Sequence, residues 1–252
     1  VAIVVDLAQL HYESTIQFHS IIGVMLGLFL VFRINTAYDR WWEGRKLWGK
    51  LVNDTRYLAI KINNILPVDR TADREFFIDM IANIPFATKE HLRDSILVSE
   101  LSLPDETLRN NVISSTHRPN KLADALFERT NQLYKDQIID GYQLYILDKE
   151  LKGFVDMIGG CERIKTTPIP FSFSMFIKKF LFIYSLTLPV SFAWQFGYWT
   201  TPIVILTFYF LVSVELISEE IEDPFGEDIN DLPLDEICFK IKKNVEEIML
   251  KN

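Results

Sequence analysis

Residues 20–51 begin as an apolar segment and run directly into a segment rich in Arg, Lys and Trp. No charged side chain occurs in residues 20–32, whereas Arg33, Arg40, Arg45 and Lys46 follow together with three tryptophans. An apolar helix of this kind belongs in a bilayer, and the basic, aromatic continuation belongs at its cytoplasmic face and in water. We therefore predict one continuous helix, half in lipid and half in water.

The distribution of apolar residues indicates a membrane protein with a large aqueous part. Of the 252 residues, 49% are hydrophobic and 24% are charged, a combination that is rare in soluble proteins. The apolar residues concentrate near the start and between residues 171 and 217, and the charged residues lie between these regions. We predict an all-α membrane protein with four transmembrane helical segments and a helical cytosolic domain.

This pattern divides the chain into four parts. We assign residues 1–35 to transmembrane helices 1 and 2, residues 36–168 to the cytosolic helical domain, residues 169–218 to transmembrane helices 3 and 4, and residues 219–252 to an acidic loop and a cytosolic C-terminal helix. Because the chain starts at Val1 inside an apolar run, we expect helix 1 to be truncated. We expect the third span over residues 171–196 and the fourth over residues 202–217. Lys178 and Lys179 place the entrance of the third span in the cytoplasm, and four spans return the chain to the side on which it started, so both termini should be cytoplasmic.

Within the aqueous part, the apolar spacing and the helix-breaking residues predict only helices. Pro67 should end the first helix, and Asp73 should cap the next one. Further helices are expected over residues 121–139 and 143–158, and the pair Gly159-Gly160 should end the second of them. An amphipathic helix over residues 236–250 completes the prediction.

Several chemistries are disfavoured by the sequence. The formal charge of −8 argues against a nucleic acid partner. Cys161 and Cys238 are too isolated for a disulfide framework, and the four histidines show no metal-binding spacing. No phosphate loop, nucleophile elbow or zincin motif occurs, so we predict a protein that is not an enzyme. A nucleophile made of Cys161 with His91 or His117, brought together by the fold, is the alternative.

Two small motifs mark the second membrane helix. Gly23 and Gly27 are four residues apart and define a face where another helix can approach closely. Val24, Leu28 and Phe32 form an adjacent apolar stripe with the same spacing. Periodicity alone indicates that this stripe faces lipid or a neighbouring helix.

Acidic residues follow the fourth span, with eight carboxylates between Glu219 and Asp235. Oxygen-rich loops of this kind bind Ca²⁺ or another hard divalent cation, and the bend at Pro224 and Gly226 would expose backbone carbonyls. The alternative is a solvated acidic turn that caps helices. Glu215, near the end of the fourth span, is a further candidate because a carboxylate in a membrane segment is often functional; the alternative is that it lies close enough to the end of the span to sit in water.

The motif Phe32-Arg33-x-Asn35-x-Ala37-Tyr38-x-Arg40-Trp41-Trp42-Glu43-x-Arg45-x-x-Trp48-Gly49, together with Ile221-Glu-Asp-Pro-Phe-Gly226, resembles the bestrophin channels, most closely their bacterial members. The resemblance covers nearly the whole chain. It implies a homopentamer around a central pore in the lipid of the bacterial inner (plasma) membrane, with the large domain in the cytoplasm.

The resemblance also implies roles for individual residues. Val24, Leu28 and Phe32 would form a hydrophobic pore neck that acts as a gate, and Tyr142 would form the cytosolic aperture. A Ca²⁺ clasp like that of the animal members would use the side chains of Asp228 and Asp231 and carbonyls near Glu220 and Asp223. No cofactor is required, and Ca²⁺ or another divalent cation is the candidate ligand.

From these observations we expect a passive channel for small monovalent ions. The charge of −8 per subunit favours cations such as Na⁺ and K⁺. Because animal and plant bestrophins conduct chloride, an anion channel of the same family is the first alternative. A non-conducting membrane scaffold is the second, and a membrane enzyme that uses Glu215 or the acidic loop with a metal is the third.

Overall fold

The computed structural model describes residues 16–95, 101–103 and 105–250, and every regular element in this part of the chain is a helix. The chain divides into two compact units. The first comprises Val1–Trp41 with Pro168–Pro224, and the second comprises Trp42–Thr167 with Phe225–Asn252. The truncated first helix expected before residue 16 lies outside the described residues.

The long helix predicted from residues 20–51 is confirmed. Helix α2 (Ile16–Ile65) runs for 50 residues without a break, about 75 Å at 1.5 Å per residue. Where the apolar segment ends, the hydroxyl of Thr36 donates a hydrogen bond to the carbonyl of Phe32 (2.8 Å), which satisfies a polar side chain within the helix. The helix ends at Ile65 because Pro67 has no amide hydrogen to continue it.

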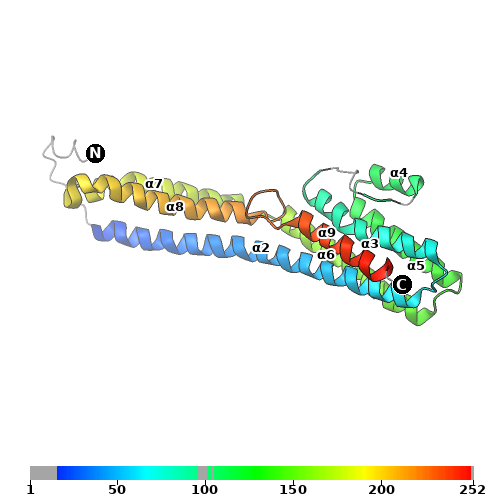
Figure 1. Cartoon of the computed structure of the whole chain (residues 1–252). Coiled ribbons are helices and arrows are strands. Elements are labelled where there is room, and N and C mark those ends of the chain that lie inside the picture. The colour runs from blue at the N-terminus through cyan, green and yellow to red at the C-terminus, as the bar shows by residue number, and fades with distance from the viewer. Residues whose placement is uncertain (1–15, 96–100, 104, 251–252) are drawn as a thin grey trace. The chain divides into compact units, whose positions relative to one another are not determined.

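In the first unit, α2 packs against two antiparallel helices, α7 (Phe171–Phe196) and α8 (Thr200–Glu222) (Figure 1). The short 3₁₀ helix η2 (Gly197–Trp199) joins them, and Gly197 makes the turn with a φ of 53°, which favours glycine. The core of the unit contains Leu26 and Leu30 of α2 and Ile177 and Leu181 of α7. The bounds of α7 match the predicted third span, whereas α8 extends beyond the predicted end at residue 217.

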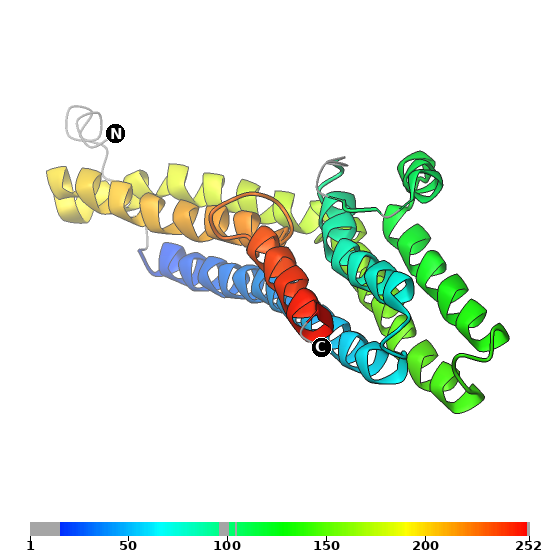
Figure 2. The same ribbon diagram turned by 45° about the vertical axis from the view of Figure 1, so that its right-hand side comes forward.

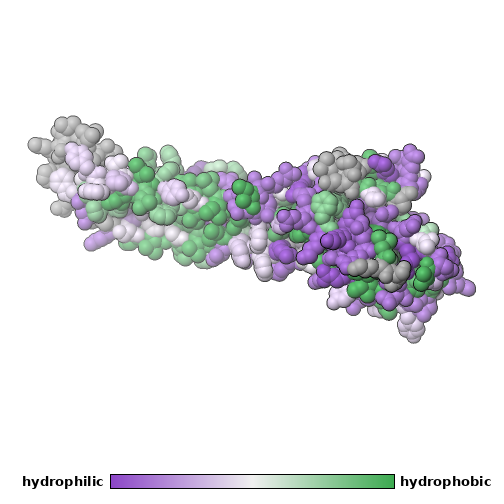
Figure 3. All heavy atoms as spheres, viewed as in Figure 1, coloured by the Kyte–Doolittle hydropathy of each residue, from purple (hydrophilic) through white to green (hydrophobic). Residues whose placement is uncertain are grey.

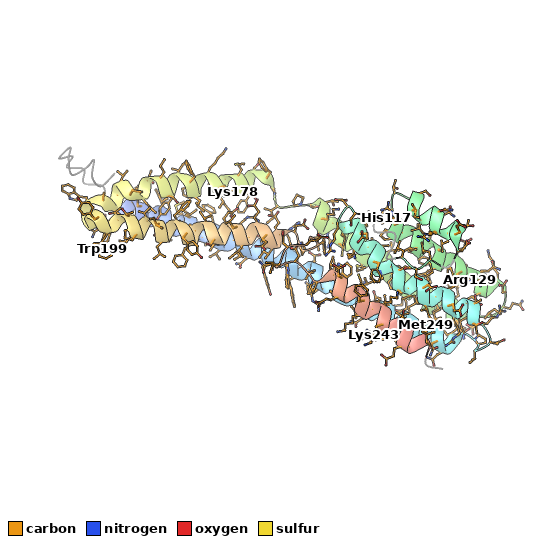
Figure 4. All side chains as sticks on the ribbon, turned by 45° about the horizontal axis from the view of Figure 1, so that its top comes forward. His117, Arg129, Lys178, Trp199, Lys243 and Met249 are labelled. Carbon is orange, nitrogen blue, oxygen red and sulfur yellow. The ribbon has the colours of Figure 1, made fainter. Side chains whose placement is uncertain are left out.

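The outer surface of the first unit is apolar. Large hydrophobic side chains are exposed along both α7 and α8, among them Phe182, Leu186, Ile205 and Tyr209, and hydrophobic residues cover much of this surface (Figure 3). The stretches Gln17–Ile65 and Phe171–Glu222 are long and apolar enough to cross a membrane, judged by length and composition alone. Lys178 lies on α7, and Trp199 lies in the short helix η2 that follows α7 (Figure 4).

The second unit is a helical bundle built on α3 (Thr71–Leu92), α5 (Arg118–Lys135), α6 (Gly141–Thr166) and α9 (Leu234–Leu250) (Figure 2). The short helix α4 (Glu106–Ser114) contacts α5. Every residue from Met80 to Glu90 is buried, including the charged Lys89. The Lys89 ammonium lies 2.7 Å from a carboxylate oxygen of Asp235 at the start of α9, so an ion pair connects α3 to α9.

Several local predictions for this unit were wrong. Asp73 does not cap α3, which begins at Thr71; instead its buried carboxylate accepts a hydrogen bond from Arg129 of α5. Gly160 does not end α6, which continues to Thr166. A Cβ atom on Gly160 would lie 2.9 Å from the side chain of Leu47, so the missing side chain allows α6 to approach α2 closely.

Other differences concern helix starts. Helix α4 was not predicted; its N-cap is Asp105, whose carboxylate accepts a hydrogen bond from the amide of Leu108 (3.2 Å). Helix α5 starts at Arg118 and α6 at Gly141, both earlier than predicted. In each case a polar residue directly before the helix caps the exposed amides of its first turn.

Candidate functional site

The apolar stripe of α2 lies on a bare face of the helix. We call Val24, Leu28 and Phe32 the neck stripe; their exposed fractions are 73%, 55% and 56%. Leu26 and Leu30, each two residues further along and therefore about 200° around the helix axis, are buried against α7. One face of α2 is thus packed within the subunit, and the face that carries the neck stripe presents bulky apolar side chains to whatever lies outside it.

The two glycines beside the neck stripe differ in their surroundings. A Cβ atom on Gly23 would lie 2.6 Å from the hydroxyl of Tyr184, whereas none of the described residues has an atom within 4 Å of a Cβ on Gly27. The predicted close approach of another helix is therefore confirmed at Gly23, where α7 is the partner, and is not seen at Gly27.

A buried charge cluster follows the neck stripe directly. Arg33 is 1% exposed, and its guanidinium lies 2.7 Å from a carboxylate oxygen of Glu222 and 3.7 Å from one of Glu215. The other oxygen of Glu222 accepts a hydrogen bond from the amide of Ile169 (2.8 Å), and its backbone carbonyl accepts one from Arg40 (3.0 Å). We call these residues the Arg33 cluster. It connects α2, the segment before α7, and the end of α8.

The Arg33 cluster fixes the helix that carries the neck stripe. Charges removed from water are costly unless they are paired, so the cluster specifies how α2 sits on α8 at this level. Within the described residues, neither carboxylate oxygen of Glu215 has a hydrogen-bond partner. The sequence analysis singled out Glu215 but not Glu222, although Glu222 makes more contacts. Arg33 could have indicated it, because a charged residue directly after an apolar span needs a partner of opposite charge.

The predicted aperture residue lies at the beginning of α6. Tyr142 is 84% exposed in the first turn of that helix. Asp140 and Gln143 form a capping box around this turn: the carboxylate of Asp140 accepts from the amide of Gln143 (2.8 Å), and the side chain of Gln143 accepts from the amide of Asp140 (2.9 Å). A firmly started helix therefore presents the tyrosine ring outward.

The acidic segment forms an ordered turn. A carboxylate oxygen of Asp231 accepts a hydrogen bond from the amide of Asp228 (2.8 Å). The same oxygen would lie 2.6 Å from a Cβ atom on Gly226, so any residue other than glycine at position 226 would require a shift. Arg93 of α3 contacts this turn: its guanidinium donates to the carbonyl of Phe225 (3.2 Å) and to Asp235 (2.9 Å).

The four predicted clasp positions are divided between the two units. Glu220 and Asp223 belong to the first unit, at the end of α8, and Asp228 and Asp231 belong to the second. The hydrogen bond from the amide of Asp228 to the carboxylate of Asp231 closes the acidic turn itself and does not cap a helix, because α9 begins only at Leu234. The other oxygens of Asp228 and Asp231 could still serve as ligands for a hard cation.

Burial makes Cys161 unsuitable as a nucleophile. Burial raises the pKa of its thiol to about 12, and its sulfur lies 3.6 Å from the sulfur of Met157. The thiolate is the reactive form, so this cysteine is inert at neutral pH. Its neighbour Glu162, however, contacts two histidines, His91 and His117, from two other helices. No pattern in the sequence indicated this cluster.

These observations define a class: an all-helical membrane protein whose longest helix carries an unpacked apolar stripe next to a buried charge cluster. The family model described as the bacterial/fungal bestrophin protein matches residues 1–247, and the chain belongs to this family. The resemblance noted in the sequence is thus confirmed. Bestrophins are ion channels, so the chain is not an enzyme, and the alternative of a metal-dependent membrane enzyme is set aside.

The chain is similar to several named proteins. It is 39% identical over 231 residues to a protein of Nostoc sp., covering 90% of this chain and 75% of that one. It is 35% identical over 244 residues to a protein of Synechocystis sp., covering 94% and 79%. Both are named voltage-dependent anion channel-forming proteins. A crystal structure of a bacterial bestrophin homologue from Klebsiella pneumoniae superposes with a TM-score of 0.93 at 27% identity, covering 100% of this chain and 94% of that one.

Proposed function

We propose that this chain is the subunit of a homopentameric channel that passes small monovalent ions passively across a bacterial inner membrane. In this proposal four helical segments per subunit lie in the membrane lipid, and the large helical domain lies in the cytoplasm. The observation that carries the proposal is the neck stripe, three bulky apolar side chains exposed on a helix whose other face is packed.

Five neck stripes around an axis would close the pore without any charge. Each stripe would contribute one side chain to each of three apolar rings, spaced about 6 Å apart along the helix. Narrow apolar rings exclude water and therefore ions, so the pore is closed when the rings are narrow. Opening requires α2 to move, and the space beside Gly27 leaves room for such a movement. Tyr142 would narrow the cytosolic exit.

For the conducted ion, the names of the relatives support anions as the first candidate. They give no support to the cation preference inferred from the net charge. Cations remain the second candidate because each subunit carries a formal charge of −8, which would attract them to the cytosolic vestibule. Ca²⁺ or another divalent cation at Asp228 and Asp231, with carbonyls near Glu220 and Asp223, is proposed as a regulatory ligand.

The reversal potential of the purified full chain in a planar bilayer with a NaCl gradient tests this function. A value near the chloride equilibrium potential is expected for the first candidate. A value near the sodium equilibrium potential would instead support the second candidate. Absence of any current from folded, reconstituted protein would contradict the channel proposal and favour the non-conducting scaffold.

The neck is tested by replacing Val24, Leu28 and Phe32 together with alanine. Smaller apolar rings wet more easily, so open probability or conductance should rise. A matched control replaces Phe182, Leu186 and Val190, which are also exposed, apolar and four residues apart, but lie on α7. Currents that are unchanged in the α2 variant, or changed equally in both variants, would remove the neck from this proposal.

A further inference from the structure

The second unit contains a cluster of two histidines and a glutamate that ion conduction does not use. His91 lies in the last turn of α3, His117 is the N-cap residue of α5 (Figure 4), and Glu162 lies on α6. The Nε2 atoms of His91 and His117 lie 2.7 Å and 2.6 Å from the same oxygen, Oε1 of Glu162. The two imidazole rings are stacked, with centroids 4.4 Å apart.

We propose that this cluster is a binding site for Zn²⁺ or a similar first-row divalent ion. The ligands would be Nε2 of His91, Nε2 of His117 and the carboxylate of Glu162, with water in a fourth position. Two imidazoles and one carboxylate are a common donor set for zinc, whereas Ca²⁺ and Mg²⁺ prefer oxygen ligands alone. The site therefore differs in chemistry from the acidic segment after α8.

The geometry fits such an ion after small movements. All three donor atoms lie within 4.8 Å of one another. In a tetrahedral zinc site, metal–ligand distances near 2.1 Å separate the ligand atoms by about 3.4 Å. The present Nε2–Oε1 distances are those of hydrogen bonds, so side-chain shifts of roughly 1 Å or less would admit the ion. The three side chains are 25%, 29% and 31% exposed, which leaves access for the ion and its water.

Neighbouring groups are compatible with a bound cation. The ammonium of Lys165 lies 3.3 Å from the carbonyl of His91, but it also lies 2.6 Å from the carboxylate of Asp94. That carboxylate offsets the positive charge beside the site. Cys161 precedes Glu162 in the chain, but its buried sulfur contacts Met157 and so does not supply a fourth ligand.

Metal binding should loosen the start of α5. Nδ1 of His117 accepts a hydrogen bond from the amide of Asn120 (3.2 Å), so the neutral ring carries its proton on Nε2, where it faces Glu162. An ion at Nε2 displaces that proton, and the neutral ring then carries its proton on Nδ1, facing the Asn120 amide. Because two donors cannot bond to each other, the cap is lost and amide exchange at the start of α5 should become faster.

The test is a Zn²⁺ titration of the purified, chelator-treated full chain against a chromophoric competitor. One ion per subunit is expected. The variants Glu162→Gln and His91→Ala should each weaken binding at least tenfold. His117→Asn should weaken it equally while keeping the helix cap, because asparagine is a good N-cap but its shorter side chain cannot reach the ion. Each variant is compared with the wild type for its metal-free melting temperature, so that loss of binding is not mistaken for unfolding.

A matched control places the ion. The double variant Asp228→Asn with Asp231→Asn removes the acidic turn and leaves the histidine cluster unchanged, so it should bind Zn²⁺ like the wild type. The proposal is overturned if the wild type binds no stoichiometric Zn²⁺. It is also overturned if Glu162→Gln and His91→Ala keep wild-type affinity, or if only the acidic-turn variant loses it.

Discussion

The substitution Arg33→Ala should strongly lower the stability of the first unit. The guanidinium of Arg33 is almost fully buried and lies 2.7 Å from Glu222 and 3.7 Å from Glu215. The substitution would leave the carboxylates of Glu215 and Glu222 in a buried environment without the guanidinium that lies between them. It would also remove a direct connection between α2 and α8.

The expected loss is large because one partner of a buried ion pair is removed. Such changes cost about 3–5 kcal/mol of the free energy of unfolding, mostly because a charge stays buried and unpaired. For chains of this size, 1 kcal/mol corresponds to roughly 2–4 °C in melting temperature. We therefore expect the melting temperature of the Arg33→Ala variant to fall by about 10 °C.

Size-exclusion chromatography after stepwise heating of detergent-purified protein measures this effect. Arg45→Ala is the matched control, since Arg45 is an exposed arginine on the same helix and should change the melting temperature by no more than about 2 °C. A triple variant, Arg33→Met with Glu215→Gln and Glu222→Gln, should recover most of the loss because no charge stays unpaired. An Arg33→Ala variant that melts like the wild type, or a triple variant no better than the single one, would refute the reasoning.

Three further predictions concern other parts of the chain. Replacing Asp228 and Asp231 with asparagine should abolish any effect of Ca²⁺ on the currents, and an intact response would place the ligand elsewhere. Gly23→Ala should lower the melting temperature because its Cβ would meet the tyrosine hydroxyl of α7, whereas Gly27→Ala, with open space, should be neutral or stabilising; equal effects would contradict this. Burial alone would raise the pKa of Asp235, but hydrogen bonds from its two basic partners hold it below the usual value. The stability it contributes is therefore present above about pH 4 and lost as pH falls below that, so Asp235→Asn should destabilise at neutral pH and converge with the wild type in acid.

The helices that the sequence predicted best are those whose extent is set by composition and by helix-breaking proline and glycine residues. The bounds of the third span were predicted correctly because an apolar run lies between Pro170 and Gly197. Both residues limit the helix through their own backbone conformation, which does not depend on distant contacts. The continuous α2 followed from a change in composition with no proline inside it. The prediction for Gly160 was wrong because a glycine can either end a helix or allow a neighbouring helix to approach closely. Only the contact with Leu47 in the folded chain shows that Gly160 does the second.

The parts of the site that the sequence missed depend on contacts between distant segments. Glu222 binds Arg33 from a helix far along the chain, and its importance was hidden among eight acidic residues. The histidine cluster is formed by residues from three different helices, His91, His117 and Glu162. Their spacing in the sequence does not indicate that they share a site. Sequence patterns report what neighbours in the chain do, whereas these sites are products of the bundle.

The neck stripe leads to a prediction that separates gating from ion selectivity. Its three side chains carry no charge, so five copies can decide how readily water and ions pass but cannot prefer one sign of charge. Replacing Val24, Leu28 and Phe32 with alanine should therefore raise the current while leaving the reversal potential in a NaCl gradient unchanged. The measurement is a current–voltage curve of wild type and variant in the same bilayer. A shifted reversal potential would mean that the neck itself discriminates between ions, for example by the cost of removing their water. An unchanged potential would direct the search for selectivity to exposed charged or polar groups, since buried charges such as Arg33 are already paired within the subunit.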